Sequence, residues 1–126
     1  MAEIRCNAVF ARPPEEVWNV VGDLTRVDWI PTIEHSELSD GVRTNTFVGL
    51  GPIEEQILVH DAAAMVCEYS VINSPVITTH HATLSVIPHA DGSEVIWTTT
   101  VEPAFFADLI EPGLQAALVE LASVLG

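Results

Sequence analysis

Apolar residues follow two different spacings along this chain, and the change of spacing separates a long first part from a short last part. Up to about residue 102, apolar and polar residues alternate in short runs, as they do in β-strands with one buried face. The alternation predicts seven strands, at residues 2–11, 33–39, 42–49, 53–61, 65–73, 78–87 and 93–101. Short stretches rich in Gly, Asp, Asn, Ser and Pro separate the last six runs, so these strands should form an antiparallel meander.

Two short helical segments are expected between the first two strands. Pro13 and Pro14 stand where a helix can begin, and the apolar residues from Val17 to Leu24 form one stripe. A second helical turn is expected over residues 27–30. Pro31 should end it, because a residue that precedes proline disfavours helical backbone.

The last part of the chain has helical spacing. After Glu102-Pro103, leucines recur at intervals of four, three and four residues, at Leu114, Leu118, Leu121 and Leu125. Pro112 leaves two starting points open. It either kinks a helix that begins near residue 104 or opens the main helical segment as its first residue.

These elements predict one α+β domain over residues 1–126. The sequence contains no internal repeat or linker, and its length of 126 residues suits one core. A seven-stranded antiparallel sheet cannot bury its apolar face on itself. The C-terminal helix must therefore cover the sheet.

Composition excludes some partners. Eighteen acidic residues stand against four arginines and no lysine, which gives a formal net charge of −14. Such a surface repels nucleic-acid phosphates and anionic lipid headgroups, so nucleic acid is not expected as a partner.

No run approaches the roughly 18 apolar residues of a membrane span, and residues 1–12 do not resemble a signal peptide. We expect a cytoplasmic protein with Cys6 and Cys67 as reduced core thiols. The sequence leaves open whether it forms a homodimer.

Several local strings, in this order, resemble one superfamily. Residues 11–18 (Ala-Arg-Pro-Pro-Glu-Glu-Val-Trp) and Trp29-Ile-Pro31 are similar to the opening of bacterial polyketide cyclase/dehydrase-type proteins. Residues 68–72 (Glu-Tyr-Ser-Val-Ile) resemble a strand of the plant pollen-allergen proteins. Residues 92–98 (Gly-Ser-Glu-Val-Ile-Trp-Thr), followed by Glu102-Pro103, match further bacterial motifs. The chain thus resembles the START and birch-pollen-allergen (SRPBCC) superfamily over nearly its whole length.

The resemblance implies a helix-grip fold: a curved seven-stranded antiparallel sheet around a C-terminal helix, two short helices after the first strand, and a ligand cavity between sheet and helix. It does not imply one reaction, since members include lipid and hormone carriers, aromatic polyketide cyclases and proteins without a known ligand. The terminal helix is shorter here than is usual, which bears on the size of the cavity.

Strand alternation indicates which polar residues share the inner face. The resemblance places Val95, Trp97, Thr99 and Val101 toward the helix. By the same alternation His80 lies with Leu84, Tyr69 lies with Cys67, and Glu55 lies with Ile53, Ile57 and Val59. A bulge in a strand would reverse this assignment. The expected inner polar set is Glu55, Tyr69, His80 and Thr99.

This set suits two kinds of chemistry. A buried carboxylate has a raised pKa and can act as a base, and a tyrosine hydroxyl can stabilise an enolate, as cyclisation or dehydration requires. Glu55, His80 and Tyr69 are therefore candidate catalytic residues. The same groups can instead orient the polar end of a bound ligand, or serve only the fold, as an ion pair of Glu55 with an arginine would.

No other catalytic or cofactor motif is present. His80 and His81 face opposite sides of one strand and lack a third ligand, so we expect no metal. Residues 49–51 (Gly-Leu-Gly) form a turn rather than a phosphate loop, and no cofactor is implied. There is no Gly-x-Ser-x-Gly elbow for nucleophilic hydrolysis.

Three functions remain open. The first is binding of a small hydrophobic or aromatic molecule, with the cavity lined by Trp29, Ile53, Ile57, Leu84, Val95, Trp97, Thr99 and Phe105. The second is a metal-independent polyketide cyclase or dehydratase acting on a poly-carbonyl or aromatic substrate. The third is a non-catalytic protein-interaction module with an acidic convex surface and a filled core.

Overall fold

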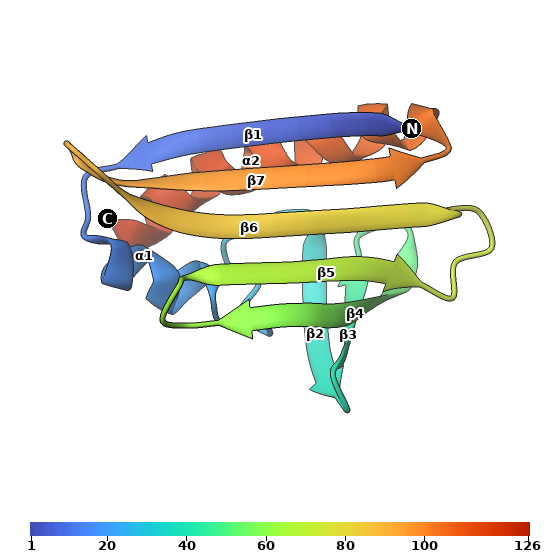
Figure 1. The fold of residues 1–126 in the computed structure, drawn as a ribbon. Coiled ribbons are helices and arrows are strands. Elements are labelled where there is room, and N and C mark those ends of the chain that lie inside the picture. The colour runs from blue at the N-terminus through green and yellow to red at the C-terminus, as the bar shows by residue number, and fades with distance from the viewer.

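A single antiparallel sheet organises the structure, a computed structural model that describes residues 1–126 (Figure 1). Its spatial order is β1-β7-β6-β5-β4-β3-β2, so only β1 leaves the order of the meander. The strands are β1 (Ala2–Phe10), β2 (Ile33–Ser39), β3 (Val42–Phe47), β4 (Gly51–Asp61), β5 (Val66–Ile72), β6 (Thr79–His89) and β7 (Gly92–Glu102). The seven predicted strands are confirmed, with their ends displaced by at most two residues.

β7 shows the clearest two-residue alternation. Every second side chain from Ser93 to Val101 is buried, including Val95, Trp97 and Thr99, and the residues between them are half-buried. β7 pairs with β1 on one side and β6 on the other, each in continuous register. These three strands therefore form the regular part of the sheet, with one apolar face directed toward the helices.

One helix, α1 (Pro14–Val21), follows β1. Proline occupies its first turn, Glu15 and Glu16 face its positive end, and Val17, Val20 and Val21 are buried. A side chain at Gly22, which follows α1, would overlap the Trp18 ring, so glycine is required there.

The second short helix predicted after strand 1 is wrong. Residues 27–30 form isolated turns, closed by backbone hydrogen bonds from Ile30 to Val27 and from Ile33 to Ile30. No run of helical hydrogen bonds can grow there, because Pro31 interrupts the segment. Trp29 is nevertheless buried, and its ring N–H donates to the carbonyl of Arg26 at 3.2 Å. A buried side chain, rather than helical backbone, holds this loop.

The C-terminal helix begins before Pro112. A short 3₁₀ turn (Ala104–Phe106) leads into α2 (Ala107–Leu125), with Pro112 inside the helix. Leu114, Leu118 and Leu121 are buried as their spacing predicts. Figure 1 shows α2 behind β1 and β7, so the helix covers one side of the sheet and leaves the β2–β3–β4 side without helical cover.

A bulge in β4 changes the side to which its last residues point. Ile57 pairs with Tyr69, but Val59 pairs with Glu68, so Leu58 is an extra residue. Val59, expected on the inner face, pairs with Glu68 and is exposed. His60 is also exposed, but it pairs with Cys67, stacks on Trp18 and hydrogen-bonds the carbonyl of Gly22 at 2.7 Å. Strand alternation is valid here only up to the bulge.

Candidate functional site

A cavity of about 950 Å³ lies between the sheet and the N-terminal half of α2. Its floor comes from the inner faces of β3 to β7, and its walls from the loop after α1, the β5–β6 connection and α2. Of its 37 lining residues, 22 are hydrophobic. The lining is therefore mostly apolar with a minority of polar residues, as in many small-molecule sites.

Most of the residues predicted for this site lie in it. Glu55, Tyr69 and His80 line the cavity together with Thr99, and so do four apolar residues of the predicted lining, namely Trp29, Ile53, Leu84 and Trp97. The rings of Trp29 and Trp97 lie 5.4 Å apart, centroid to centroid, and form part of the wall.

Three predicted lining residues lie elsewhere. Val95 is fully buried but belongs to the closed part of the core, and Ile57 packs against the core beside the bulge. Phe105 is 62% exposed, because the 3₁₀ turn presents its neighbour Phe106 to the cavity instead. The face of a strand was predictable, but the extent of the cavity along it was not.

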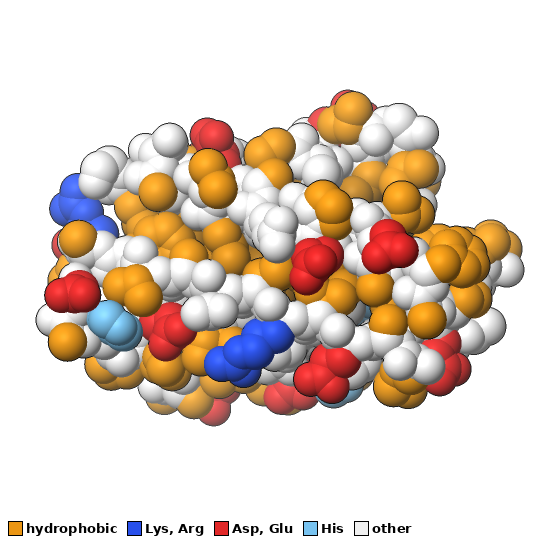
Figure 2. All heavy atoms as spheres, turned by 90° about the horizontal axis from the view of Figure 1, so that it is seen from above, with side chains coloured by type: hydrophobic (Ala, Val, Ile, Leu, Met, Phe, Trp, Pro, Cys, Tyr) orange, Lys and Arg blue, Asp and Glu red, His pale blue; other side chains and the backbone are white.

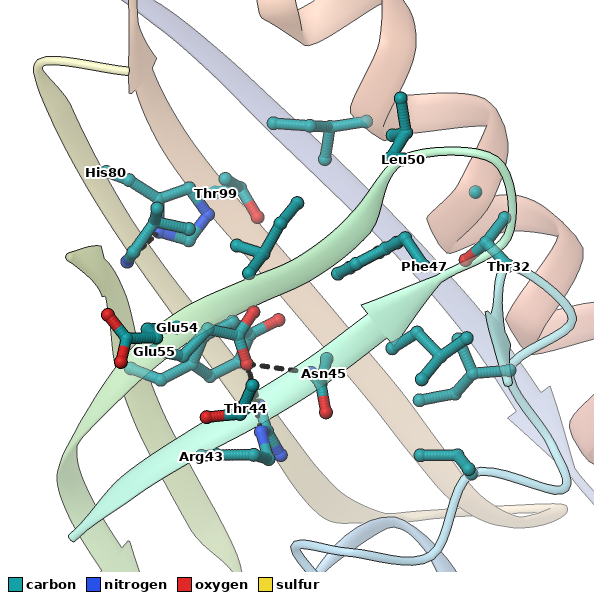
Figure 3. A pocket seen from close by; sticks show the side chains of 18 of the residues that line it. Thr32, Arg43, Thr44, Asn45, Phe47, Leu50, Glu54, Glu55, His80 and Thr99 are labelled. Atoms are coloured by element: carbon teal, nitrogen blue, oxygen red, sulfur yellow. Dashed lines mark hydrogen bonds and ion pairs between the residues drawn. The ribbon is translucent and has the colours of Figure 1, made fainter. Parts of the chain in front are cut away.

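The polar centre of the cavity is an ion pair between Arg43 of β3 and Glu55 of β4. The guanidinium Nη2 lies 2.7 Å from Glu55 Oε1, and Nε donates to the same oxygen at 2.9 Å. Asn45 Nδ2 adds a third contact to this oxygen at 3.0 Å (Figure 3). The other guanidinium nitrogen, Nη1, donates to the carbonyl of Leu24 at 3.1 Å. Glu55 is thus a held counter-ion, and its Oε2 makes no hydrogen bond within the protein.

Burial and charge act in opposite directions on Glu55. Loss of hydration raises the pKa of this carboxyl, and the neighbouring charge of Arg43 lowers it, so that the pKa remains above its ordinary value. Arg43 also lies over the ring of Tyr69, 4.8 Å from its centroid. Arg43 and Asn45 are functional candidates that the sequence did not single out. The register of β3 against β4, which sets Arg43 opposite Glu55, is the signal that identifies them.

Tyr69 accepts a hydrogen bond from Trp97 inside the cavity wall. The Trp97 ring N–H points to the Tyr69 hydroxyl oxygen at 3.0 Å. Burial, followed by the nearby charge of Glu55, raises the pKa of Tyr69 above its ordinary value. The hydroxyl stays protonated, and its own hydrogen remains free to donate.

His80 is held in one tautomer by the backbone. Its Nδ1 lies 3.1 Å from the Val71 nitrogen and accepts that N–H. In a neutral imidazole the proton must then be on Nε2. Burial, and after it the charge of His81, lowers the pKa of His80 from 6.5 to about 4. His80 is therefore a neutral hydrogen-bond donor at neutral pH rather than a ready base.

The mouth of the cavity is lined by exposed apolar side chains. Val48 and Leu50 in the β3–β4 turn, Val76 in the β5–β6 connection and Leu109 in α2 are each more than half exposed. In Figure 2, orange side chains gather at the right-hand end, where Figure 1 places the β5–β6 connection. The apolar lining thus continues out to the surface.

The donor set does not suit a metal ion. No group of three His, Cys, Asp or Glu side chains comes together in the structure, and His80 and His81 point to opposite faces. Cys6 and Cys67 are buried and unpaired.

The cavity as a whole can hold an apolar molecule, donate hydrogen bonds from His80 and Tyr69, and accept one at Glu55 Oε2. No helix of the structure is long and apolar enough to cross a membrane.

Solved structures share this fold at low sequence identity. The chain matches XoxI from Bacillus cereus with a TM-score of 0.92 and 24% identity, over 99% of this chain and 96% of that one. It matches Ara h 8.0201 with a TM-score of 0.79 and 14% identity, over 98% and 97%. The di-domain ARO/CYC BexL of the BE-7585A biosynthetic pathway matches with a TM-score of 0.79 and 16% identity, over 98% of this chain and 46% of that one.

No curated protein matches the chain in sequence. A family model, in contrast, matches all of residues 1–126, and its description is polyketide cyclase / dehydrase and lipid transport. The helix-grip fold, the cavity and this match over the whole length agree with one another. The chain belongs to the polyketide cyclase / dehydrase and lipid transport family.

Proposed function

We propose that this protein binds a small hydrophobic or aromatic molecule in the cavity between the sheet and α2. The observation that carries the proposal is the cavity itself: about 950 Å³ of space with a mostly apolar lining, in a chain of only 126 residues. A domain of this size gains stability from a filled core, so a space this large is costly unless it is used. Glu55, Tyr69 and His80 orient the polar end of the ligand.

The cyclase or dehydratase alternative rests on the same polar residues and on the fold shared with BexL. Two contacts weigh against it. Glu55 is occupied by Arg43 at 2.7 Å, and His80 carries its proton on the nitrogen that is free, so neither is a ready base. The interaction-module alternative requires a filled core, and the cavity volume weighs against it. Residence in the cytoplasm and assembly as a homodimer stay predictions.

Cavity filling tests the proposal. The neutral dye Nile red should bind wild-type protein at one saturable site, and native mass spectrometry of gently purified protein should detect any retained ligand. Ile53→Trp fills the cavity from β4 and should weaken dye binding about tenfold or more. Leu58→Trp adds the same side chain to the exposed bulge of that strand and should change little. Both variants must melt cooperatively. Equal dye affinity in the two variants, or no saturable binding to wild type, would refute the proposal.

A further inference from the structure

The hydrogen-bonding groups that the cavity leaves free are of two kinds. The protein satisfies Glu55 Oε1 three times over and leaves Oε2 free as an acceptor. On the facing strands, the Nε2–H of His80 and the hydroxyl hydrogen of Tyr69 are free donors, because the partners that these side chains have use Nδ1 and the hydroxyl oxygen. Figure 3 shows Glu55, His80 and Thr99 around one space. A ligand that pairs with all three of these groups needs both a hydrogen-bond acceptor and a hydrogen-bond donor.

The cavity offers no free positive charge. The chain has four arginines and no lysine. Arg43 is neutralised by Glu55, and Arg26, near the mouth, is paired with Asp28 at 2.8 Å. Arg5 and Arg12 do not line the cavity, whereas Asp23 and Glu54 do. An anionic ligand would therefore lose its hydration without gaining a cation, beside carboxylates.

We propose that the cavity selects a neutral ligand with both a carbonyl and a hydroxyl group, and that the Arg43–Glu55 pair excludes carboxylates because Glu55 already occupies the one cation. The inference rests on the proposed function and adds the chemical class of the ligand. The carbonyl accepts from the Nε2–H of His80 and from the hydroxyl of Tyr69. The ligand hydroxyl donates to Glu55 Oε2, and its apolar body lies against Trp29, Leu84 and Trp97.

A matched set of two-ring probes tests this selection at neutral pH. Para-hydroxymethylbenzophenone carries the ketone and a hydroxyl that does not ionise, para-ethylbenzophenone lacks the hydroxyl, and para-benzoylbenzoate replaces it with a carboxylate of similar size. Displacement of Nile red from wild type should rank the hydroxy ketone first. The carboxylate should bind about tenfold or more weakly than the hydroxy ketone.

Substitution of the counter-ion should change this preference. Glu55→Gln leaves the charge of Arg43 unpaired, so the affinity for para-benzoylbenzoate should rise about tenfold relative to that for the hydroxy ketone. Arg43→Met/Glu55→Gln removes both charges and should restore the preference for the neutral probe, which keeps the test decisive if the single variant folds poorly. Glu68→Gln removes the same charge from the outer face, where Glu68 contacts His81, and should leave the ranking unchanged.

The outcomes separate this inference from the proposed function. Saturable dye binding together with equal affinities for the three probes would overturn the ligand class and leave the cavity as a binding site. An unchanged ratio of the carboxylate and hydroxy ketone affinities in Glu55→Gln would do the same. Failure of wild type to bind Nile red and every probe would overturn both. A weakly bound carboxylate that gains only in Glu55→Gln would support both.

Discussion

The inner face of the sheet is closed at one end and open at the other. In the closed region, formed by α1, β1, the β7 residues up to Val95 and the C-terminal half of α2, Val17, Val95 and Leu121 have no exposed surface. In the open region, formed by β3 to β6, the later residues of β7 and the N-terminal half of α2, residues of similar hydrophobicity line a space of about 950 Å³. One alternating pattern thus yields a packed core where helix side chains pack directly against the sheet and a cavity where they do not.

The polar residues of the inner face differ between the two regions. Ser93 in the closed region is fully buried, and its hydroxyl donates to the carbonyl of Arg12 at 2.9 Å. The open region contains Asn45, Glu55, His80 and Thr99, and some of their donors and acceptors have no partner in the protein. The free Oε2 of Glu55 and Nε2–H of His80 thus belong to cavity-lining residues, as the proposed binding of a ligand requires, whereas the hydroxyl of Ser93 is satisfied within the protein.

The largest effect on stability is expected in the closed region. Leu121→Ala should lower the free energy of unfolding by about 4 kcal/mol, because it removes fully buried apolar atoms and leaves a cavity in the packed core. Urea denaturation measures this loss, and the affinity of the folded variant for Nile red should not change. Val119→Ala, on the exposed face of the same helix, is the control. A loss of dye affinity in Leu121→Ala would show that the two regions are not separate.

A smaller loss of stability is expected from the ion pair of the open region. Arg43→Met leaves the buried carboxylate of Glu55 without its cation and should cost about 3 kcal/mol. Arg43→Met/Glu55→Gln should regain much of this loss, because no unpaired charge remains. Urea denaturation of wild type, Arg43→Met, Glu55→Gln and the double variant gives the coupling free energy between the two side chains. Additive losses would show that the pair does not act as a unit.

The smallest of the three effects is a pH dependence assigned to His80. The pKa of His80 is lowered in the fold from 6.5 to about 4. The stability that the neutral imidazole contributes to the folded state is therefore complete above about pH 6.5 and is lost as the pH falls through about 4. Wild type should lose about 2 kcal/mol more than His80→Asn over that window. Asparagine keeps an acceptor for the Val71 N–H and does not titrate.

His81→Asn separates the two causes of this shift, because His81 lies on the outer face of the same strand and contacts Glu68. The variant keeps the burial of His80 and removes only the neighbouring charge, so most of the pH dependence of stability should remain. Parallel curves for His80→Asn and wild type would contradict the assignment to His80.

Sequence alternation predicted the faces of β6 and β7, and with them His80, Leu84, Trp97 and Thr99, because β7 alternates along its whole length and β6 alternates as far as Val86. Alternation could not assign an inner face to β3. Its two apolar residues, Val42 and Phe47, fall on opposite faces, and the residues between them are polar. Arg43 and Asn45 were therefore missed. Val59 was assigned to the wrong face because a bulge leaves no mark in the pattern. Phe105 was misplaced because a 3₁₀ turn has neither period.

The adjacent rings of Trp29 and Trp97 give the protein an optical reporter of its own. Two of its three tryptophans line the cavity, and the third, Trp18, lies apart from it against His60. Displacement of water by any occupant, whatever its identity, changes the polarity around two of the three indoles. Emission from unlabelled protein can therefore be followed during purification or screening.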